Sequence, residues 1–175
     1  MNVFGNGLEK QLDHYETLNK MPKLDIDCVL CVCGVTSENL GLILRSADIF
    51  VVKMVYYYGN GVADVKSVLK ISRNSGVLIE VVDNFDFLFS LKDSDYQIVS
   101  LEITNKSIPL RMSSFNTKIC LVVGNERNGV PEDLLEASDI SCHIDMFGNI
   151  SSLNVSIATS IALYEISQYH LNRGN

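Results

Sequence analysis

The chain has 175 residues, of which 47% are hydrophobic and 20% are charged, and its formal net charge is −7. This length and composition are typical of one globular domain and argue against a disordered chain. The negative charge argues against indiscriminate nucleic-acid binding, because neutralising phosphates requires clusters of Lys and Arg, and we expect no DNA partner.

No segment has the features of a membrane or export sequence. The most apolar run, residues 49–58, is interrupted by Lys53 and is shorter than the ~20 residues of a membrane-spanning helix. The amino terminus lacks the basic and then apolar pattern of a signal peptide. We therefore expect a cytoplasmic protein with no membrane partner.

The first half of the chain alternates apolar strands with amphipathic helices. Leu8, Leu12 and Tyr15 recur at helical spacing, which predicts an N-terminal helical extension over residues 1–22. Apolar runs predict strands at 26–33, 51–58 and 77–82. Helices are expected after the turns at 34–38 and 59–61, and a short one at 85–91.

The second half repeats this alternation and ends in a long apolar helix. The expected strands are 96–101, 119–123 and 140–146, and residues 104–118 are expected to form an irregular polar connection. Ser151, Ser152 and Asn154 precede the final helix, where capping of its free N–H groups is the simplest role. That helix is apolar around most of its circumference, which favours burial on more than one side.

Six strands alternating with helices predict an α/β fold, with a mostly parallel six-stranded sheet and helices on both faces. We expect residues 1–175 to form a single domain. Ligands of such sheets bind beyond the carboxyl ends of the strands, which points to the loops 34–39, 124–131 and 147–153.

Cysteine spacing admits two interpretations. Cys28, Cys31 and Cys33 form a Cys-x-x-Cys-x-Cys pattern, which is compatible with a metal or redox site. The same residues lie in a continuous apolar run, where alternate side chains of a strand point to opposite faces. Free buried thiols are the favoured interpretation, with Cys120 and Cys142 as further examples.

Several common types of binding and catalytic site are excluded by the residues at particular positions. Asp64 stands where a dinucleotide fingerprint requires its third glycine, and Val130-Pro131 stands where a phosphate loop requires Lys-Ser or Lys-Thr. The histidines His14, His143 and His170 form no pair at metal-ligand spacing, so we expect no metal site. No Gly-x-Ser-x-Gly elbow is present, which leaves hydrolytic covalent catalysis without support.

Three loops resemble one known family in order and in spacing. Asn-Leu-Gly-Leu-Ile-Leu-Arg at 39–45 resembles the first motif of the SpoU (TrmH-type) RNA 2′-O-ribose methyltransferases of the SPOUT superfamily. Leu-Val-Val-Gly-Asn-Glu-Arg-Asn-Gly-Val-Pro at 121–131 resembles their second motif, and residues 144–165 resemble their third. The resemblance covers about residues 28–166. One departure is Asp145, where the family usually has Pro.

The resemblance implies a C-terminal trefoil knot, with residues 119–170 as the knotted region that binds S-adenosylmethionine. It also implies a homodimer in which both subunits contribute to each site, in agreement with the apolar final helix. The substrate would be a ribose 2′-hydroxyl of tRNA or rRNA. Because cofactor contacts in the family are largely made by the backbone, we expect activity to survive the change at Asp145.

Site residues follow from the motif match. Arg45 would activate the 2′-hydroxyl; because a guanidinium stays protonated in nearly all settings, we expect it to orient the adjacent phosphate and stabilise the developing alkoxide. The expected catalytic residues are Arg45, Asn39, Glu126, Ser152 and Asn154. The expected cofactor-binding residues are Leu101, Gly124, Asn125, Ile144, Met146, Ser152 and Leu153. Asn39 also suits helix capping, and Glu126 also suits a solvated loop.

RNA would be held through its phosphates by basic residues outside the pocket. The residues considered for this contact are Lys10, Lys20, Lys23, Arg111 and Arg127. An alternative function is a catalytically weak, homodimeric RNA-binding or ligand-sensing module that retains the fold. The acidic balance and Asp145 favour that alternative, whereas the presence of all five expected catalytic residues opposes it.

Overall fold

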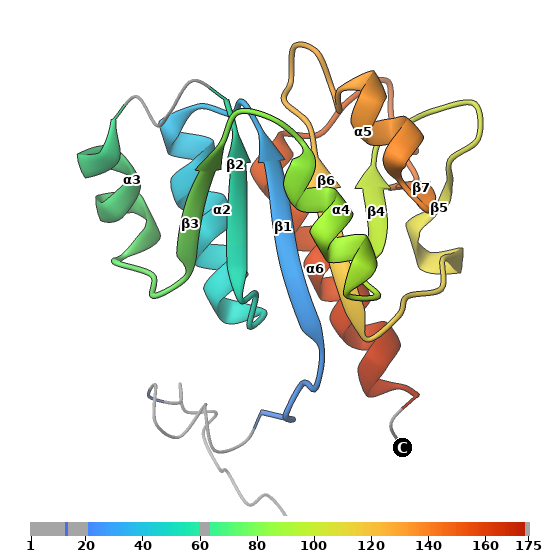
Figure 1. The fold of residues 1–175 in the computed structure, drawn as a ribbon, viewed down its shortest axis with the longest axis horizontal. Helices are drawn as coiled ribbons and strands as arrows, with labels where there is room; N and C mark the ends of the chain where they lie inside the picture. The colour runs from blue at the N-terminus through green and yellow to red at the C-terminus, as the bar shows by residue number, and fades with distance from the viewer. Residues whose placement is uncertain (1–12, 14–20, 60–63, 174–175) are drawn as a thin grey trace, which may run out of the picture.

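The computed structural model describes residue 13, residues 21–59 and residues 64–173 (Figure 1). In this part of the chain the strands form one seven-stranded sheet in the order β3-β2-β1-β6-β4-β7-β5. Every strand pair in the sheet is parallel. The predicted α/β class is confirmed. The expected N-terminal helix lies outside the described residues, apart from residues 13, 21 and 22.

The strands are β1 Asp27–Cys33, β2 Met54–Tyr58, β3 Leu78–Val82, β4 Gln97–Leu101, β5 Ile108–Pro109, β6 Lys118–Val123 and β7 Ile140–His143. The helices are α2 Ser37–Ile49, α3 Val65–Ser72, α4 Asp86–Asp93, the 3-10 helix η1 Leu110–Met112, α5 Glu132–Ala137 and α6 Val155–Leu171.

Apart from shifts of one residue, three strands differ from the sequence prediction. The sheet has seven strands, not six, because the two-residue strand β5 pairs with β7 inside the expected irregular connection. Strand β2 begins at Met54, not Val51, because Val51 has a φ of 58° in the turn that follows α2. Strand β7 ends at His143, which leaves residues 144–154 as a long loop before α6.

Helices cover both faces of the sheet, as expected from strands that are apolar on both sides (Figure 1). Helices α2 and α6 pack on one face, around fully buried residues such as Ile43 and Ile166. Helices α4 and α5 pack on the other face, where Leu88 and Leu134 meet alternate residues of β1, β4 and β6. Helix α3 packs beside α2. None of the described helices is long and apolar enough to cross a membrane.

All five cysteines are free and buried, which confirms the thiol interpretation. Burial, with a contribution from the charge of Asp27, raises the pKa of Cys28 from 9.0 to about 12. Burial also raises the pKa of Cys142 to about 12, against a hydrogen bond from Ser113 that lowers it. Among the described residues, no three His, Cys, Asp or Glu side chains gather as metal ligands do.

Late segments of the chain are inserted between early strands. Strand β6 lies between β1 and β4, and β7 lies between β4 and β5. The segment 119–170 therefore supplies most of the central strand β6 and the strand β7 next to the edge, before α6 returns along one face. The trefoil knot expected for this segment stays a prediction. The carboxyl ends of β4, β6 and β7 are adjacent at one edge of the sheet, where a ligand site is expected.

Candidate functional site

A cavity of about 230 Å³ opens at the carboxyl ends of β4, β6 and β7. Its walls are mainly apolar, with a small number of polar side chains among them. The lining residues are Leu101, Glu102, Ile103, Val123, Gly124, Asn125, Glu126, Gly129, His143, Ile144, Met146, Ser152, Leu153, Val155 and Ala158. Apolar walls that carry a few convergent polar groups are typical of small-molecule sites.

All seven residues expected to bind the cofactor line this one cavity: Leu101, Gly124, Asn125, Ile144, Met146, Ser152 and Leu153. They come from the end of β4, the loop after β6 and the loop after β7. The structure thus brings together residues that are up to about fifty positions apart in the sequence. Their roles in binding stay predictions.

The loop after β6 approaches its own backbone so closely that only glycine fits. A Cβ at Gly124 would lie 2.1 Å from the carbonyl carbon of Gly129, and Gly129 itself has a φ of +65°. Asn125 and Gly129 exchange backbone hydrogen bonds of 2.9 and 3.3 Å. The Asn125 side chain donates to the carbonyl of Cys33 (3.2 Å), which ties this loop to the end of β1.

Glu102 lines the cavity and was missed by sequence reasoning. Its Oε2 accepts from the backbone N–H of Val130 (2.9 Å), and its Oε1 accepts from that of Ile103 (2.9 Å). The carboxylate therefore joins the end of β4 to the loop after β6. The available signal was its position directly after a strand, at the edge of a parallel sheet where ligands bind.

Three of the expected catalytic residues form one hydrogen-bond network beside the cavity. Nδ2 of Asn39 donates to Oε1 of Glu126 (2.6 Å), and Nδ2 of Asn154 donates to Oδ1 of Asn39 (3.0 Å). Nδ2 of Asn154 also lies 3.4 Å from Oε1 of Glu126. The network joins the first turn of α2, the loop after β6 and the start of α6, with Asn39 buried between the other two.

The hydrogen bonds around this network show which residues cap α2 and α6. Thr36 is the N-cap of α2 and accepts from the N–H of Asn39 (3.2 Å), so the capping role considered for Asn39 is wrong. Asn154 is the N-cap of α6, since its Oδ1 accepts from the N–H groups of Ser156 and Ile157. Its amide nitrogen remains available for the network. Ser152 does not cap α6 and lies exposed in the cavity wall.

Arg45 is not part of this arrangement. It lies further along α2 than Asn39, is exposed, and does not line the cavity. In the described part of the chain it has no hydrogen-bond or ion-pair partner. Arg45 is therefore an unengaged cation on a helix whose first turn contacts the site through Asn39.

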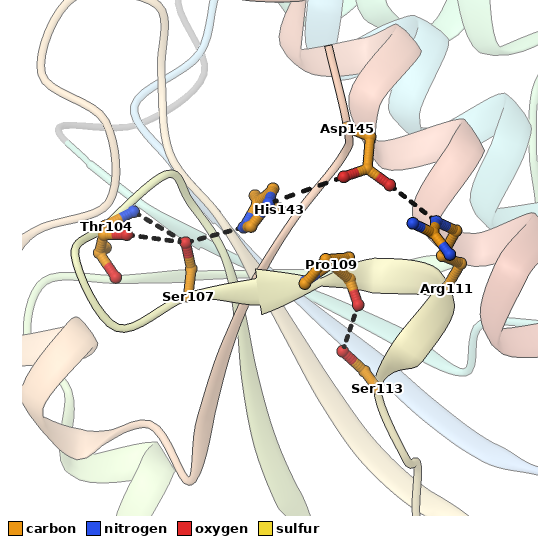
Figure 2. A network of polar contacts seen from close by, with 7 residues as sticks. All are labelled: Thr104, Ser107, Pro109, Arg111, Ser113, His143 and Asp145. Atoms are coloured by element: carbon orange, nitrogen blue, oxygen red, sulfur yellow. Dashed lines mark hydrogen bonds and ion pairs between the residues drawn. The ribbon is translucent and has the colours of Figure 1, made fainter.

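A second polar network lies just beyond the end of β7, around Asp145 (Figure 2). Oδ2 of Asp145 accepts from Nε of Arg111 at 2.8 Å, and its Oδ1 lies 4.0 Å from Nε2 of His143. The Oγ of Ser107 lies 2.9 Å from Nδ1 of His143. Arg111, considered above as an RNA contact, is thus engaged by Asp145. Lys23 and Arg127 are exposed, whereas Lys10 and Lys20 lie outside the described residues.

Comparison with known proteins identifies the family. Residues 28–164 match the model of the SpoU rRNA Methylase family. Over 172 residues the chain is 34% identical to a tRNA (guanosine(18)-2′-O)-methyltransferase of Aquifex aeolicus, covering 95% of this chain and 80% of the relative.

Solved structures agree with this match. The TrmH/SpoU tRNA modifying enzyme of A. aeolicus superposes with a TM-score of 0.78 at 32% identity, covering 86% of this chain and 80% of that one. The SpoU methyltransferase AviRb of Streptomyces viridochromogenes, solved in complex with the cofactor AdoMet, superposes with a TM-score of 0.73 at 25% identity. That match covers 88% of this chain and 62% of the AviRb chain. Because the family model spans the strands, the cavity and the Asn39–Glu126–Asn154 network, the chain belongs to the SpoU rRNA Methylase family.

Proposed function

We propose that the protein transfers a methyl group from S-adenosylmethionine to a ribose 2′-hydroxyl of tRNA or rRNA. The observation that supports this most directly is the Asn39–Glu126–Asn154 network, built by three distant segments beside an apolar cavity. The names of the A. aeolicus relative and of the AviRb complex support the substrate class and the methyl donor. An RNA substrate of this kind also supports a cytoplasmic location.

The residues of the cavity fit a methyl donor of this chemistry. When bound, S-adenosylmethionine supplies a methyl group on a cationic sulfonium. Leu101, Ile144 and Leu153 offer apolar surface for the adenosine, and the glycine loop at 124–129 offers backbone polar groups. The carboxylates of Glu102 and Glu126 favour a cation in the cavity. We propose residues 1–175 as one methyltransferase domain, with 119–170 as the cofactor-binding region.

The protein's own groups would act mainly by positioning. Transfer to a hydroxyl is an in-line displacement, so the ribose oxygen must be held in line with the donor before its proton leaves. We assign Arg45 to the phosphate beside that ribose, where its permanent charge also stabilises the developing alkoxide. Asn39, Glu126 and Asn154 fix the start of α2, the helix that carries Arg45, beside the loop after β6.

A second copy of the chain would complete the site. Leu42, Arg45 and Ile49 are exposed at i, i+3 and i+7, so they lie along one stripe of α2. Helix α6 exposes Ile157 and Tyr164, and the hydroxyls of Ser46 and Ser160, 2.7 Å apart, join the two helices. These adjoining apolar residues support a homodimer through α2 and α6, in which Arg45 faces the cavity of the other copy.

Methyl transfer is tested by incubating the purified protein with tritiated S-adenosylmethionine and unmodified tRNA or rRNA, followed by nucleoside mapping. We expect label in a single 2′-O-methylated nucleoside. Label in a base, or none with either RNA, would overturn the proposal. Binding of RNA and cofactor without transfer would instead indicate the catalytically weak RNA-binding module.

The dimer is tested separately by analytical ultracentrifugation. We expect a dimer for the parent protein and a monomer for Ile157→Glu, because a carboxylate would be buried without a partner. Leu78→Glu, which changes an equally exposed apolar residue on β3, is the matched control and should remain dimeric. A parent protein that sediments as a monomer would remove the shared site.

A further inference from the structure

The most specific feature that the proposed function leaves unused is the group Ser107, Arg111, His143 and Asp145, here called the Asp145 clamp (Figure 2). Each carboxylate oxygen of Asp145 faces a different basic side chain, Oδ2 towards Arg111 and Oδ1 towards His143. The Asp145 side chain is 27% exposed and that of Arg111 is 65% exposed, so solvent screens the carboxylate less than the guanidinium. Such a charge-assisted contact restricts the backbone on either side of residue 145.

The clamp joins two walls of the cavity. Asp145 stands between Ile144 and Met146, which both line the cavity, and His143 lines it too. Arg111 and Ser107 belong to the segment that follows β4, which contributes Glu102 and Ile103 to the cavity lining. The backbones of these segments are joined by the N–H of Glu102, which donates to the carbonyl of Cys142 (2.9 Å), and by the two-residue strand β5, whose Ile108 and Pro109 pair with Cys142 and His143. Beyond His143, side-chain contacts must hold the loop.

The hydroxyl of Ser107 indicates how His143 is held. Its Oγ accepts from the N–H of Thr104 (3.0 Å) and lies 3.0 Å from the carbonyl oxygen of Thr104. When the hydroxyl donates to that carbonyl, Nδ1 of His143 must be the donor in the contact with Oγ. Nε2 then points towards Asp145. Ser107 is fully engaged in this arrangement, so it orients the ring and is not a nucleophile.

We propose that Arg111 and Asp145 are positioning residues for the methyl donor, which act by fixing the backbone of Ile144 and Met146 against the segment that follows β4. The proposal rests on the proposed function, because it names residues that shape the same cavity. Residue 145 is Asp in a position where a proline would restrict the backbone covalently. Here an ion pair supplies the restriction, so donor affinity should depend on charge and on salt.

The test compares the removal of a cation from each of two ion pairs of similar length and exposure. Arg111→Gln breaks the 2.8 Å pair with Asp145, in which the side chains are 65% and 27% exposed. Lys53→Gln breaks a 2.6 Å pair with Asp27, in which the side chains are 59% and 25% exposed. Asp27 is the first residue of β1, and Lys53 directly precedes β2. Both therefore lie at the amino ends of the parallel strands, away from the cavity. The two variants therefore lose a similar ion pair, and only one of these pairs borders the cavity.

Calorimetric titration with S-adenosylmethionine gives the readout. We expect Arg111→Gln to raise the dissociation constant about fivefold and Lys53→Gln to leave it unchanged, while both shift the thermal midpoint by similar amounts. At saturating donor, kcat of Arg111→Gln should stay near the parent value while KM for the donor rises. Raising salt from 0.05 to 0.5 M should weaken donor binding by the parent more than by Arg111→Gln.

A charge exchange separates positioning from general damage. Arg111→Asp combined with Asp145→Arg restores opposite charges, and we expect it to bind the donor more tightly than either single change. Equal donor affinity in parent, Arg111→Gln and Lys53→Gln would overturn the clamp. A parent protein that binds no S-adenosylmethionine would instead overturn the proposed function, so the two failures are distinguishable.

Discussion

Asn39 is 87 positions from Glu126 and 115 positions from Asn154 in the sequence, yet its side chain lies within hydrogen-bond distance of both. Asn39 is 9% exposed, so its amide cannot exchange these partners freely for water. It donates to a carboxylate and accepts from another amide, which uses both ends of the side chain. The position of Glu126 beside the cavity therefore depends on Asn39.

We predict that Asn39→Ala costs about 1 kcal/mol of unfolding free energy, because it removes two hydrogen bonds whose other partners, Glu126 and Asn154, are exposed and regain water. Methyl transfer should fall by more than the donor affinity, since Asn39 does not line the cavity. Urea unfolding, calorimetry and the tritium assay measure the three quantities. Unchanged stability together with unchanged transfer would show that the network has no role.

For Arg45 we predict a loss of methyl transfer without a loss of stability or of donor affinity. Arg45→Ala should leave the thermal midpoint and the donor affinity near the parent values, because the side chain is exposed and lies outside the cavity. Methyl transfer should drop at least about a hundredfold, as expected when a group that stabilises developing charge is lost. Lys70→Ala, which removes an exposed cation from the neighbouring helix α3, is the control and should transfer methyl normally. Parent-rate transfer by Arg45→Ala would remove Arg45 from the mechanism.

At the scale of elements, the cavity depends on how tightly the loop after β6 folds back on itself. A methyl group at Gly124 would lie 2.1 Å from the carbonyl carbon of Gly129 and 2.3 Å from the nitrogen of Val130. Both neighbours are backbone atoms, so the loop must open to admit the methyl group. Gly148, in the loop after β7, has no atom within 4 Å of an added Cβ.

We therefore predict that Gly124→Ala costs roughly 2–3 kcal/mol of unfolding free energy, as forced overpacking does, and weakens donor binding at least tenfold. Gly148→Ala is the matched control and should change stability by less than about 0.5 kcal/mol. Urea unfolding and calorimetric titration of both variants provide the comparison. Similar donor affinities in the two variants would show that the loop's closure does not shape the cavity.

The positions of six strands were predictable because apolar runs bounded by turns repeat along the chain, but the exposure of the edge strand β3 was not, because its residues are as apolar as those of the buried strands. Strand β5 was not, because Pro109 and an exposed Ile108 carry no apolar pattern; their pairing comes from the neighbouring β7. The cavity lining was predictable through motif resemblance. Glu102 and the Asp145 clamp were not, because their partners are backbone groups and side chains brought together only by the fold.

At the scale of the whole molecule, the buried thiols make the free energy of unfolding decrease at alkaline pH. The pKa of Cys28 and that of Cys142 are raised by burial to about 12, whereas an unfolded thiol titrates near 9.0. Below pH 9 these thiols are protonated in both the folded and the unfolded chain, so their contribution to the free energy of unfolding is fully present. Between pH 9 and 12 the unfolded chain loses protons that the folded chain keeps, so stability falls as the pH rises.

The free energy of unfolding is predicted to fall by about 1.4 kcal/mol per pH unit for each such thiol once the pH exceeds 9. Urea unfolding at pH 8, 9, 10 and 10.5 measures it. Because lysines and tyrosines also titrate in this range, Cys142→Ala is the necessary comparison, and its slope should be smaller by about one proton. Identical slopes in the parent protein and in the variant would contradict the linkage.

Strand β3 ends the sheet, and no strand in the described ranges pairs with its outer side. Its Leu78, Ile79 and Val81 are 63%, 39% and 52% exposed, with Glu80 as the one charged residue among them. If two molecules met edge to edge in antiparallel register about Glu80, the two carboxylates would face each other and repel. We therefore predict that replacing Glu80 with valine increases light scattering at high protein concentration, because this repulsion is lost.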